Sequence, residues 1–494
     1  MRLSWHTYQY YPYERALALR EVTALLKATS TRAIEGGIEL DRYSDAASAG
    51  QLTYFAGYVN GHGYTQTVQA KLEEAAQLGK NRQATRYSAH GLHEYKGKFN
   101  PQIARAILNI FDVRPSQRVL DPFCGSGTTL VECAHRGVSG HGTDLNPFAV
   151  YLANTKLLAL STPVDALRTI LQLITKSFSR TKRWTTTVKK DVRGAYLRAW
   201  FDPDILQIIE IAANRIKAEA GDLAPIFLSI ASNLLRDYSL QDPYDLRIRR
   251  RKSPLPETPF VDAFRSAAER FLERLGSAQS VLGTKKREGG ATLCDVTALA
   301  KTKSRQLFDA ALTSPPYAMA LPYIDTQRLS LVWLDLLTAD RILGLESELI
   351  GSRELRGTDR REIVARMNEN KAGIPQVQAD FCITLQNSLT PKDGFRRKAV
   401  PTLLYRYFAS MQRSFTSIRA AVKLSAPFAL IIGHNHTVLG GVRYDINTPV
   451  HLASIATHAG WKIDELIELQ TYQRYGYHMS NAVAAETLLI LRNQ

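Results

Sequence analysis

The sequence has few cysteines and no long apolar run. Its four cysteines cannot form a disulfide framework across 494 residues, and Cys124 and Cys133, nine residues apart, do not have the spacing of zinc ligands. It contains no stretch of about 18 apolar residues, which a membrane-spanning helix would require. Residues 1–13 hold several aromatic side chains but no apolar signal-peptide core. We therefore expect no bound metal and a location in the reducing cytoplasm.

Acidic side chains are scarce relative to basic ones. The chain carries 63 Lys+Arg and 46 Asp+Glu, for a net charge of +17. Over half of this excess lies in residues 151–290, which hold 24 basic and 15 acidic side chains. A field of this sign favours a polyanionic partner. Solubility alone is the alternative explanation of the charge.

The chain is too long for one ordinary hydrophobic core. We therefore expect either one large catalytic domain with insertions or two domains. Short apolar runs typical of buried strands occur within residues 93–155 and again within 291–494. Residues 156–290 instead show apolar side chains three or four apart, as in helices. This pattern predicts an α/β protein with a largely helical insertion.

A glycine-containing loop follows the first of these strands. The strand ends at Asp121, and the sequence Asp-Pro-Phe-Cys-Gly-Ser-Gly-Thr-Thr runs from there to Thr129. Gly125 and Gly127 let the backbone pass close to a ligand, and the next helix points its N-terminus toward that ligand. The third glycine of dinucleotide-binding loops is missing. The loop therefore favours a nucleoside with a small polar tail over a pyrophosphate.

A second carboxylate is expected at the end of the next strand. Asp144 closes the run 137–144 and stands 23 residues after Asp121. A carboxylate at this distance can accept both hydroxyl protons of a ribose. Phe148 opens the following helix, where it could flank an adenine or simply fill the core. The sequence leaves both positions for Phe148 open.

The loop Thr313-Ser314-Pro315-Pro316-Tyr317 contains the candidate catalytic residues. It ends the apolar run 308–312, because proline lacks the N–H that a strand ladder needs. The chain therefore turns out at the strand's carboxyl edge, where open α/β sheets bind ligands. Ser314 and the Pro315 carbonyl offer two acceptors, and Tyr317 offers a flat face. Together they suit the exocyclic amino group of a nucleobase.

This loop resembles the catalytic loop of the DNA amino-methyltransferases. Its serine is more similar to the N4-cytosine branch than to the N6-adenine branch, which usually has Asp or Asn there. The loop 121–129 resembles the S-adenosylmethionine loop of class I methyltransferases, and residues 93–101 resemble the segment that precedes it. The resemblance covers residues 93–154 and about 291–494. It implies a Rossmann-like, seven-stranded mixed sheet, S-adenosylmethionine as cofactor, and methylation of a base flipped out of double-stranded DNA.

The spacing and the resemblance together assign residues to three roles. The expected cofactor contacts are Lys98, Phe99, Asp121, Phe123, Gly125, Gly127, Thr128, Asp144, Phe148 and Asp295. The expected catalytic residues are Ser314, Pro315, Pro316 and Tyr317. A basic run is expected either to contact DNA phosphates or to form a solvated face; it comprises Arg247, Arg249, Arg250, Arg251 and Lys252. The polar turn at 473–478, between strands at 461–469 and 486–491, resembles the terminal hairpin of the same family.

The expected organisation has four parts. Residues 1–92 have no assigned role, 93–155 form the cofactor half, 156–290 a basic insertion and candidate target-recognition region, and 291–494 the catalytic half with a polar insertion at about 341–400. The expected product is N4-methylcytosine in DNA, made within a restriction-modification or related defence system with a possible cognate endonuclease. The alternatives are N6-adenine methylation, an RNA amino-methyltransferase, and an inactive nucleic-acid-binding protein.

Overall fold

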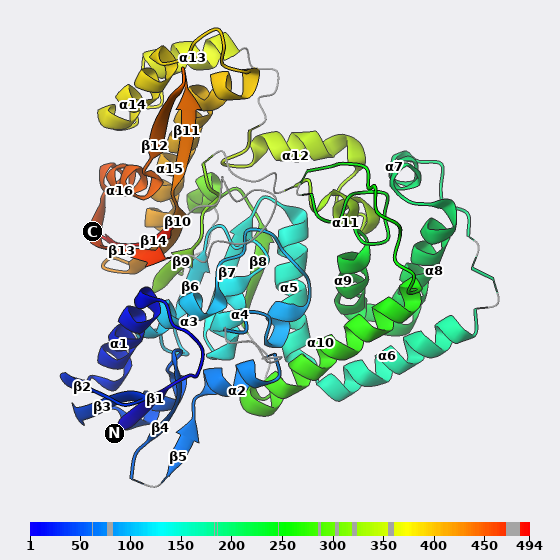
Figure 1. Cartoon of the computed structure of the whole chain (residues 1–494), viewed down its shortest axis with the longest axis horizontal. Helices are drawn as coiled ribbons and strands as arrows, with labels where there is room; N and C mark the ends of the chain where they lie inside the picture. Colours follow the sequence, from blue (N-terminus) through cyan, green and yellow to red (C-terminus); the bar gives the residue numbers. More distant parts are fainter. Residues whose placement is uncertain are drawn as a thin grey trace.

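The computed structural model describes the chain except residues 62, 77–82, 182, 185, 246, 285–287, 302–305, 319–323, 354–359 and 471–484. Its centre is a seven-stranded sheet in the order β13-β14-β10-β9-β6-β7-β8 (Figure 1). The seven strands are β6 (Arg118–Asp121), β7 (Ser139–Asp144), β8 (Gly289–Leu293), β9 (Ala310–Thr313), β10 (Pro427–Gly433), β13 (Trp461–Gln470) and β14 (Ala485–Asn493). Strands β8, β7, β6, β9 and β10 run parallel, and β14 runs antiparallel to β10 and β13. The expected seven-stranded mixed sheet is thus confirmed.

Successive side chains of the sheet pack into different cores, as the period of two in a strand requires. Val119, Leu312 and Ile431 face a core shared with α1 (Pro12–Leu26) and α3 (Pro101–Ile110). Their neighbours Leu120 and Leu430 face the opposite core, against α14 (Gln376–Asn387), α15 (Phe395–Ala421) and α16 (Thr448–His458). Because strands buried on both faces read as continuous apolar runs, they were recognisable in the sequence.

Residues of the N-terminal region form a second, antiparallel sheet. Its order is β2-β3-β1-β4-β5, and its strands are β1 (Arg2–Trp5), β2 (Ser30–Ile34), β3 (Gly37–Arg42), β4 (Phe55–Val59) and β5 (Tyr64–Gln66). Helix α1 joins this sheet to α3, and the two sheets share one apolar core. Helix α2 (Val68–Glu74) and the short turn η2 (Ser88–Gly91) lead to the cofactor half. The region therefore covers one face of the central sheet (Figure 1).

The helical insertion packs on α5 (Pro147–Ser161), beside strand β8 at the edge of the central sheet (Figure 1). It consists of α6 (Val164–Ser179), α7 (Val192–Trp200), α8 (Pro203–Ala220), α9 (Ala224–Leu234) and α10 (Phe260–Leu282). Among the described residues no single helix meets the length and hydropathy of a membrane span. Only the pair α5 and α6, bent by 112°, meets them when joined.

A second insertion follows the catalytic loop. It contains α11 (Arg328–Trp333), α12 (Ile342–Glu348), α13 (Arg360–Asn368) and α14, and it leads into the 27-residue helix α15. The hairpin formed by β11 (Asn435–Leu439) and β12 (Val442–Ile446) lies with α13 and α14 in the upper lobe of Figure 1. The expected polar insertion, residues 341–400, extends from η5 (Ala339–Arg341) into the first turns of α15, which continues through Pro401.

Candidate active site

The loop between β6 and α4 (Thr128–His135) depends on its two glycines. Gly125 and Gly127 have φ values of +47° and +81°, in the left-handed region that favours glycine. A Cβ atom at Gly127 would lie 2.8 Å from the Cβ of Ala153 on α5. A side chain larger than hydrogen therefore cannot be accommodated at Gly127 without a shift. The loop brings its backbone to the carboxyl edge of the sheet, where the sequence placed it.

Asp144, the last residue of β7, stabilises this loop through hydrogen bonds. Its Oδ2 accepts the Gly125 N–H at 2.9 Å, and its Oδ1 accepts the Asn146 N–H at 2.8 Å. Each carboxylate oxygen has a further lone pair, so both can still accept a hydroxyl proton. Burial raises the pKa of Asp144 to about 6, although these backbone bonds oppose the rise. The carboxylate is thus ionised at neutral pH and positioned to accept.

Asp121 joins the cofactor strand to the catalytic strand. Its Oδ1 accepts the hydroxyl proton of Thr313 at 2.6 Å, across the neighbouring strands β6 and β9. Its Oδ2 is buried and makes no well-formed hydrogen bond to the described residues. Burial raises the pKa of Asp121 to about 6. A buried acceptor with a free lone pair suits the ammonium group of an amino acid tail.

The segment before α3 meets the glycine loop through Tyr95. A Cβ at Gly125 would lie 3.4 Å from Cε1 of Tyr95. Burial, followed by the charge of Asp144, raises the pKa of the Tyr95 hydroxyl. Lys98 Nζ donates to the Thr85 carbonyl at 3.2 Å, and Phe99 packs against the core shared with α3. Tyr95 lies within residues 93–101, and the sequence alone assigns no role to its side chain.

Lys156 is a second residue that the sequence did not reveal. It lies on α5, is fully buried, and its Nζ donates to the Ser126 carbonyl at 2.7 Å and to Ser126 Oγ at 3.0 Å. Burial lowers the pKa of Lys156 well below its ordinary value. Ser126 lies between the two glycines, so the hydrogen bonds from Lys156 stabilise the centre of the loop. In the sequence it is one lysine within a helical pattern.

Asp295 lies beyond β8 and not at the end of the strand. Its Oδ1 accepts the Thr297 N–H at 2.8 Å, which caps the short turn η4 (Val296–Lys301). Cys294 N–H donates to the Asp144 carbonyl at 3.1 Å, so Asp295 still follows a residue bonded to Asp144. The sequence placed the strand at 291–295, whereas it ends at Leu293.

Phe148 takes the second of the two positions that the sequence left open. It is 1% exposed in the core beneath the helical insertion, where its ring meets the edge of His93 with centroids 5.1 Å apart. Of the two positions that the sequence left open, the structure favours core packing, because the Phe148 side chain is enclosed by apolar residues. Phe123 packs partly buried against the core of α15, and Thr128 is buried at the start of α4.

The catalytic loop leaves the sheet at the same edge. Ser314 Oγ donates to the Ile431 carbonyl of β10 at 3.1 Å. This bond uses the only hydroxyl proton, so the oxygen faces any further partner as an acceptor. Pro315 is buried and Pro316 is partly exposed. Asp121 and Asp144 are thus the last residues of two parallel strands, and Asp295 and Ser314 follow the ends of two others.

Tyr317 is held by three parts of the chain. Its hydroxyl donates to Glu486 Oε1 on β14. Its ring lies against Gly433, where a Cβ would be only 2.8 Å from Tyr317 Cε2. Gly351 of the second insertion approaches the Tyr317 carbonyl, where a Cβ would be 2.6 Å from the oxygen. Glu486 had no signal in the sequence, since it lies 169 residues away.

The basic run of the first insertion is mostly exposed, and three of its arginines also contact other parts of the protein. Arg251 donates to the carbonyls of Asp237 and Ser239 at 2.6 and 2.8 Å. Arg249 forms an ion pair with Asp245, and Arg250 lies over the ring of Trp200 at 4.7 Å. Arg247 and Lys252 are exposed. The turn at 473–478 lies outside the described residues.

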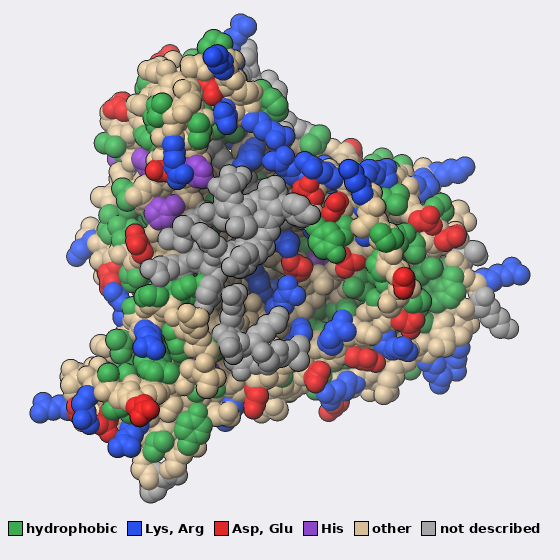
Figure 2. Space-filling view, viewed as in Figure 1, with side chains coloured by type: hydrophobic (Ala, Val, Ile, Leu, Met, Phe, Trp, Pro, Cys, Tyr) green, Lys and Arg blue, Asp and Glu red, His purple; other side chains and the backbone are tan. Residues whose placement is uncertain are grey.

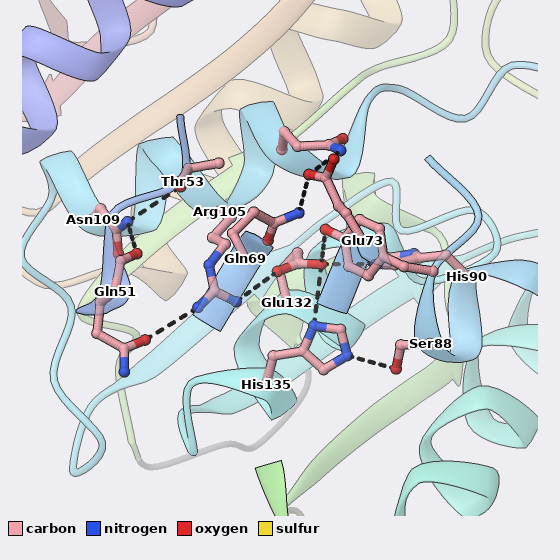
Figure 3. Close-up of polar contacts among 12 residues, drawn as sticks. Gln51, Thr53, Gln69, Glu73, Ser88, His90, Arg105, Asn109, Glu132 and His135 are labelled. Carbon is pink, nitrogen blue, oxygen red and sulfur yellow. Dashed lines mark hydrogen bonds and ion pairs between the residues drawn. The ribbon is translucent and has the colours of Figure 1, made fainter. Parts of the chain in front are cut away.

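A buried polar network joins Glu132 and His135 of α4 to His90 and Arg105 (Figure 3). Glu132 Oε1 accepts from Tyr87 at 2.8 Å and from His90 Nε2 at 2.7 Å, and Arg105 Nη1 lies 3.5 Å from Glu132 Oε2. Burial lowers the pKa of His90 to about 3, so this imidazole is neutral. His135 completes a set of possible metal ligands. The guanidinium of Arg105 already supplies the positive charge there, so the network serves to fix α4.

Comparisons with known proteins agree with this arrangement. Residues 91–171 match the profile of a family described as "RMKL-like, methyltransferase domain". The chain is 44% identical over 72 residues to the type II methyltransferase M.MjaII of Methanocaldococcus jannaschii, covering 14% of this chain and 13% of that protein. It is 25% identical over 308 residues to the type II methyltransferase M.MvaI of Kocuria varians, covering 57% and 64%.

A relative of a different kind is the tRNA (guanine(10)-N2)-dimethyltransferase of Methanothermobacter thermautotrophicus. It is 40% identical over 52 residues, covering 10% of this chain and 16% of that protein. The chain thus spans less than two thirds of the length of each of these three curated relatives.

Residues 91–171 match a methyltransferase domain, and the cofactor is S-adenosylmethionine. The residues present fit this molecule. The glycine loop allows close approach, Asp144 can accept ribose hydroxyls, and Asp121 Oδ2 is a buried acceptor with a free lone pair. Tyr95 and Lys156 add support on either side of the loop.

Proposed function

We propose that this chain is a site-specific, cytoplasmic DNA methyltransferase that methylates the exocyclic N4 amino group of cytosine in double-stranded DNA. One observation is the main support. Ser314 is fixed as an acceptor by its bond to Ile431, on the strand end that Thr313 ties to Asp121. An acceptor for an amino group therefore lies beside the cofactor strand. The relatives named as type II methyltransferases favour DNA as the substrate.

The chemistry requires little from the protein beyond positioning. S-adenosylmethionine supplies an electrophilic methyl group on its sulfonium. Ser314 Oγ and the Pro315 carbonyl accept the two amino protons and so favour a pyramidal nitrogen whose lone pair points at that methyl. No base is needed before the attack, since the proton is lost from the cationic product. Orientation of this kind can supply roughly 7 to 11 kcal/mol of the barrier reduction.

Tyr317 is the proposed platform for the flipped base. Flipping costs a few kcal/mol, and stacking on an aromatic ring returns about 1 to 3 kcal/mol. The ring is held in place by its hydroxyl bond to Glu486 and by its contact with Gly433. A ring fixed at its edge and at its tip loses little further entropy when a base stacks on it.

The helical insertion, residues 156–290, is the proposed target-recognition region. Arg247, Arg249, Arg250, Arg251 and Lys252 stay candidates for DNA contact, with Arg247 and Lys252 the most available. Arg251 also lines a depression of about 740 Å³ together with Tyr244 and Arg270. A cognate restriction endonuclease is the proposed partner.

Three alternatives remain, and one of them has support from a relative. Aspartate or asparagine usually precedes Pro-Pro in adenine and RNA amino-methyltransferases, and Ser314 argues against both. The tRNA methyltransferase relative supports the RNA alternative over a short segment only. An inactive binding protein is disfavoured because the acceptors of both sites are in place.

Methyl transfer to matched DNA and RNA duplexes distinguishes these substrates. We expect labelled S-adenosylmethionine to label the DNA duplex and leave the RNA duplex unlabelled. Labelling of RNA alone would overturn the DNA proposal while leaving the cofactor site intact. The Ser314→Ala variant serves as the blank for labelling that does not depend on the catalytic loop.

A further inference from the structure

A cleft lined by arginines lies between the second insertion and the β11–β12 hairpin. Its volume is about 170 Å³, and we call it the arginine cleft. It is lined by Arg353, Arg396, Arg397, Val400, Leu403, Asn435, His436 and Thr437. Arg396 and Arg397 are exposed on the first turn of α15. None of the described lining residues is acidic.

Positive charge from both insertions converges here. Partial burial, followed by the charges of Arg247 and Arg396, lowers the pKa of Arg353. Arg247 belongs to the first insertion and stands 106 residues before Arg353 in the sequence. The fold therefore brings cations from distant parts of the chain close together. Figure 2 shows blue Lys and Arg side chains running from the upper lobe toward the helical insertion. Such a cluster is unfavourable by itself and is relieved by an anion.

Asp393 is the carboxylate that precedes Arg396 and Arg397 at the start of α15. Hydrogen bonds from backbone N–H groups, and to a smaller extent the charge of Arg397, lower its pKa. Its Oδ2 accepts from the Thr390 N–H and hydroxyl at 2.8 and 2.9 Å. The same oxygen accepts the Gly440 N–H at 3.0 Å. Asp393 therefore holds the turn beside the hairpin, and its single charge faces three arginines of the cleft lining, Arg353, Arg396 and Arg397.

The arginine cleft contacts the catalytic loop directly. Asn435, one of its lining residues, donates through Nδ2 to the carbonyl of Ala318, the residue after Tyr317. On the other side, Gly351 lies against the Tyr317 carbonyl, and Arg353 follows two residues later. Asn435 would therefore lie between an anion bound in the cleft and the loop that receives the base.

We propose that the arginine cleft binds the phosphodiester backbone of the DNA strand beside the flipped nucleotide. This rests on the proposed function. Guanidinium groups bind phosphate oxygens through paired N–H bonds, and the cleft adjoins the loop through the hydrogen bond of Asn435 to Ala318. Phe395 precedes these arginines and is 76% exposed, with Arg396 over its ring. An exposed aromatic among arginines suits contact with unstacked DNA.

The test is the salt dependence of binding to a duplex oligonucleotide, measured for the unmodified protein and for the double variant Arg396→Gln/Arg397→Gln. We expect the log–log slope to fall by about 0.9 for each phosphate group that the variant no longer binds. KM for DNA should rise, while affinity for S-adenosylmethionine stays unchanged. The matched control is Arg2→Gln/Arg32→Gln, which removes the same charge from the N-terminal sheet, where both side chains are 68% exposed.

The outcomes separate the cleft from the activity. An unchanged slope in the double variant, with DNA methylation intact in the unmodified protein, would overturn the cleft proposal and leave the function standing. A reduced slope without methyl transfer by the unmodified protein would support the cleft and overturn the function. Equal reductions of the slope in both double variants would show a general charge effect and so also overturn the cleft. The single variant Arg353→Gln provides a second reading should the double variant fail to fold.

Discussion

Ser314 has one hydroxyl proton, and the fold directs it to the Ile431 carbonyl. If its oxygen accepts the substrate amino group, Ser314→Ala should lower turnover by about 10²- to 10³-fold, comparable to the removal of one hydrogen-bonding group at a reacting centre. Affinity for S-adenosylmethionine should stay within about twofold of the unmodified protein. Single-turnover kinetics and calorimetry measure the two quantities. Ser280→Ala, at an exposed position on α10, is the control. Near-normal turnover of Ser314→Ala would refute the role of Ser314 as acceptor of the amino group.

Asp121 and Asp144 make cofactor binding sensitive to pH. Burial raises the pKa of each to about 6, so both are carboxylates above pH 7 and become protonated below pH 6. A protonated carboxyl is a weaker acceptor for the ribose hydroxyls and the ammonium. Affinity should therefore be constant above about pH 7 and decline as the pH falls below about 6.

The variant Asp144→Ala should bind S-adenosylmethionine weakly at every pH. It loses the ribose acceptor and also frees the Gly125 N–H that Asp144 now holds. Calorimetry across this pH range checks both statements. Unchanged affinity of this variant, with the fold intact, would show that Asp144 does not bind the cofactor.

Gly433 sets the position of the Tyr317 ring. A Cβ at residue 433 would lie 2.8 Å from Tyr317 Cε2, so Gly433→Ala should displace the ring. A misplacement of this order near the reacting atoms costs about a hundredfold in rate. Gly50→Ala is the control, because its Cβ would be 3.9 Å from the nearest atom. Full activity of Gly433→Ala would mean that Tyr317 does not position the base.

At the scale of elements, β6, β9 and β10 could be predicted because they are short apolar runs, and β7 because Asp144 stands 23 residues after Asp121. The strands ending at Asp121 and Asp144 and the strand at 428–433 match β6, β7 and β10 within two residues. The small N-terminal sheet was not predicted. Its β2 is almost wholly exposed, so it lacks the alternation that marks a strand.

The site was predictable to the same degree. Motifs carried by one contiguous loop, such as 121–129 and 313–317, could be found from residue types and spacing. Glu486 and Asn435 could not, because their contacts with the catalytic loop depend on segments far apart in the chain. Phe148 shows why residue type alone is not sufficient, since an aromatic residue after a strand can pack in the core as readily as it can contact a ligand.

For the whole molecule, stability should depend on buried carboxyl groups at the N-terminal sheet. Burial raises the pKa of Glu14 to about 7, from 4.5 in the unfolded chain. The folded state therefore binds this proton more tightly, and the associated stability is full below about pH 4.5 and lost as the pH rises through 7. Glutamine at this position can keep the capping bond to the Tyr11 N–H.

The variant Glu14→Gln should match the unmodified protein near pH 5 and exceed its unfolding free energy by roughly 1 to 3 kcal/mol at pH 8. Denaturant unfolding at the two pH values measures this. Glu39→Gln on β3 of the neighbouring N-terminal sheet is the control and should show no gain at pH 8, since Glu39 is paired with Arg2 and Arg32 and its pKa is lowered. Equal effects of Glu14→Gln at both pH values would contradict the linkage.

The central claim is the product, and the identity of the methylated nucleoside tests it most directly. DNA incubated with the protein and S-adenosylmethionine is digested to nucleosides and separated by mass spectrometry. We expect N4-methyldeoxycytidine, absent from the Ser314→Ala reaction. N6-methyldeoxyadenosine without N4-methyldeoxycytidine would contradict the cytosine specificity.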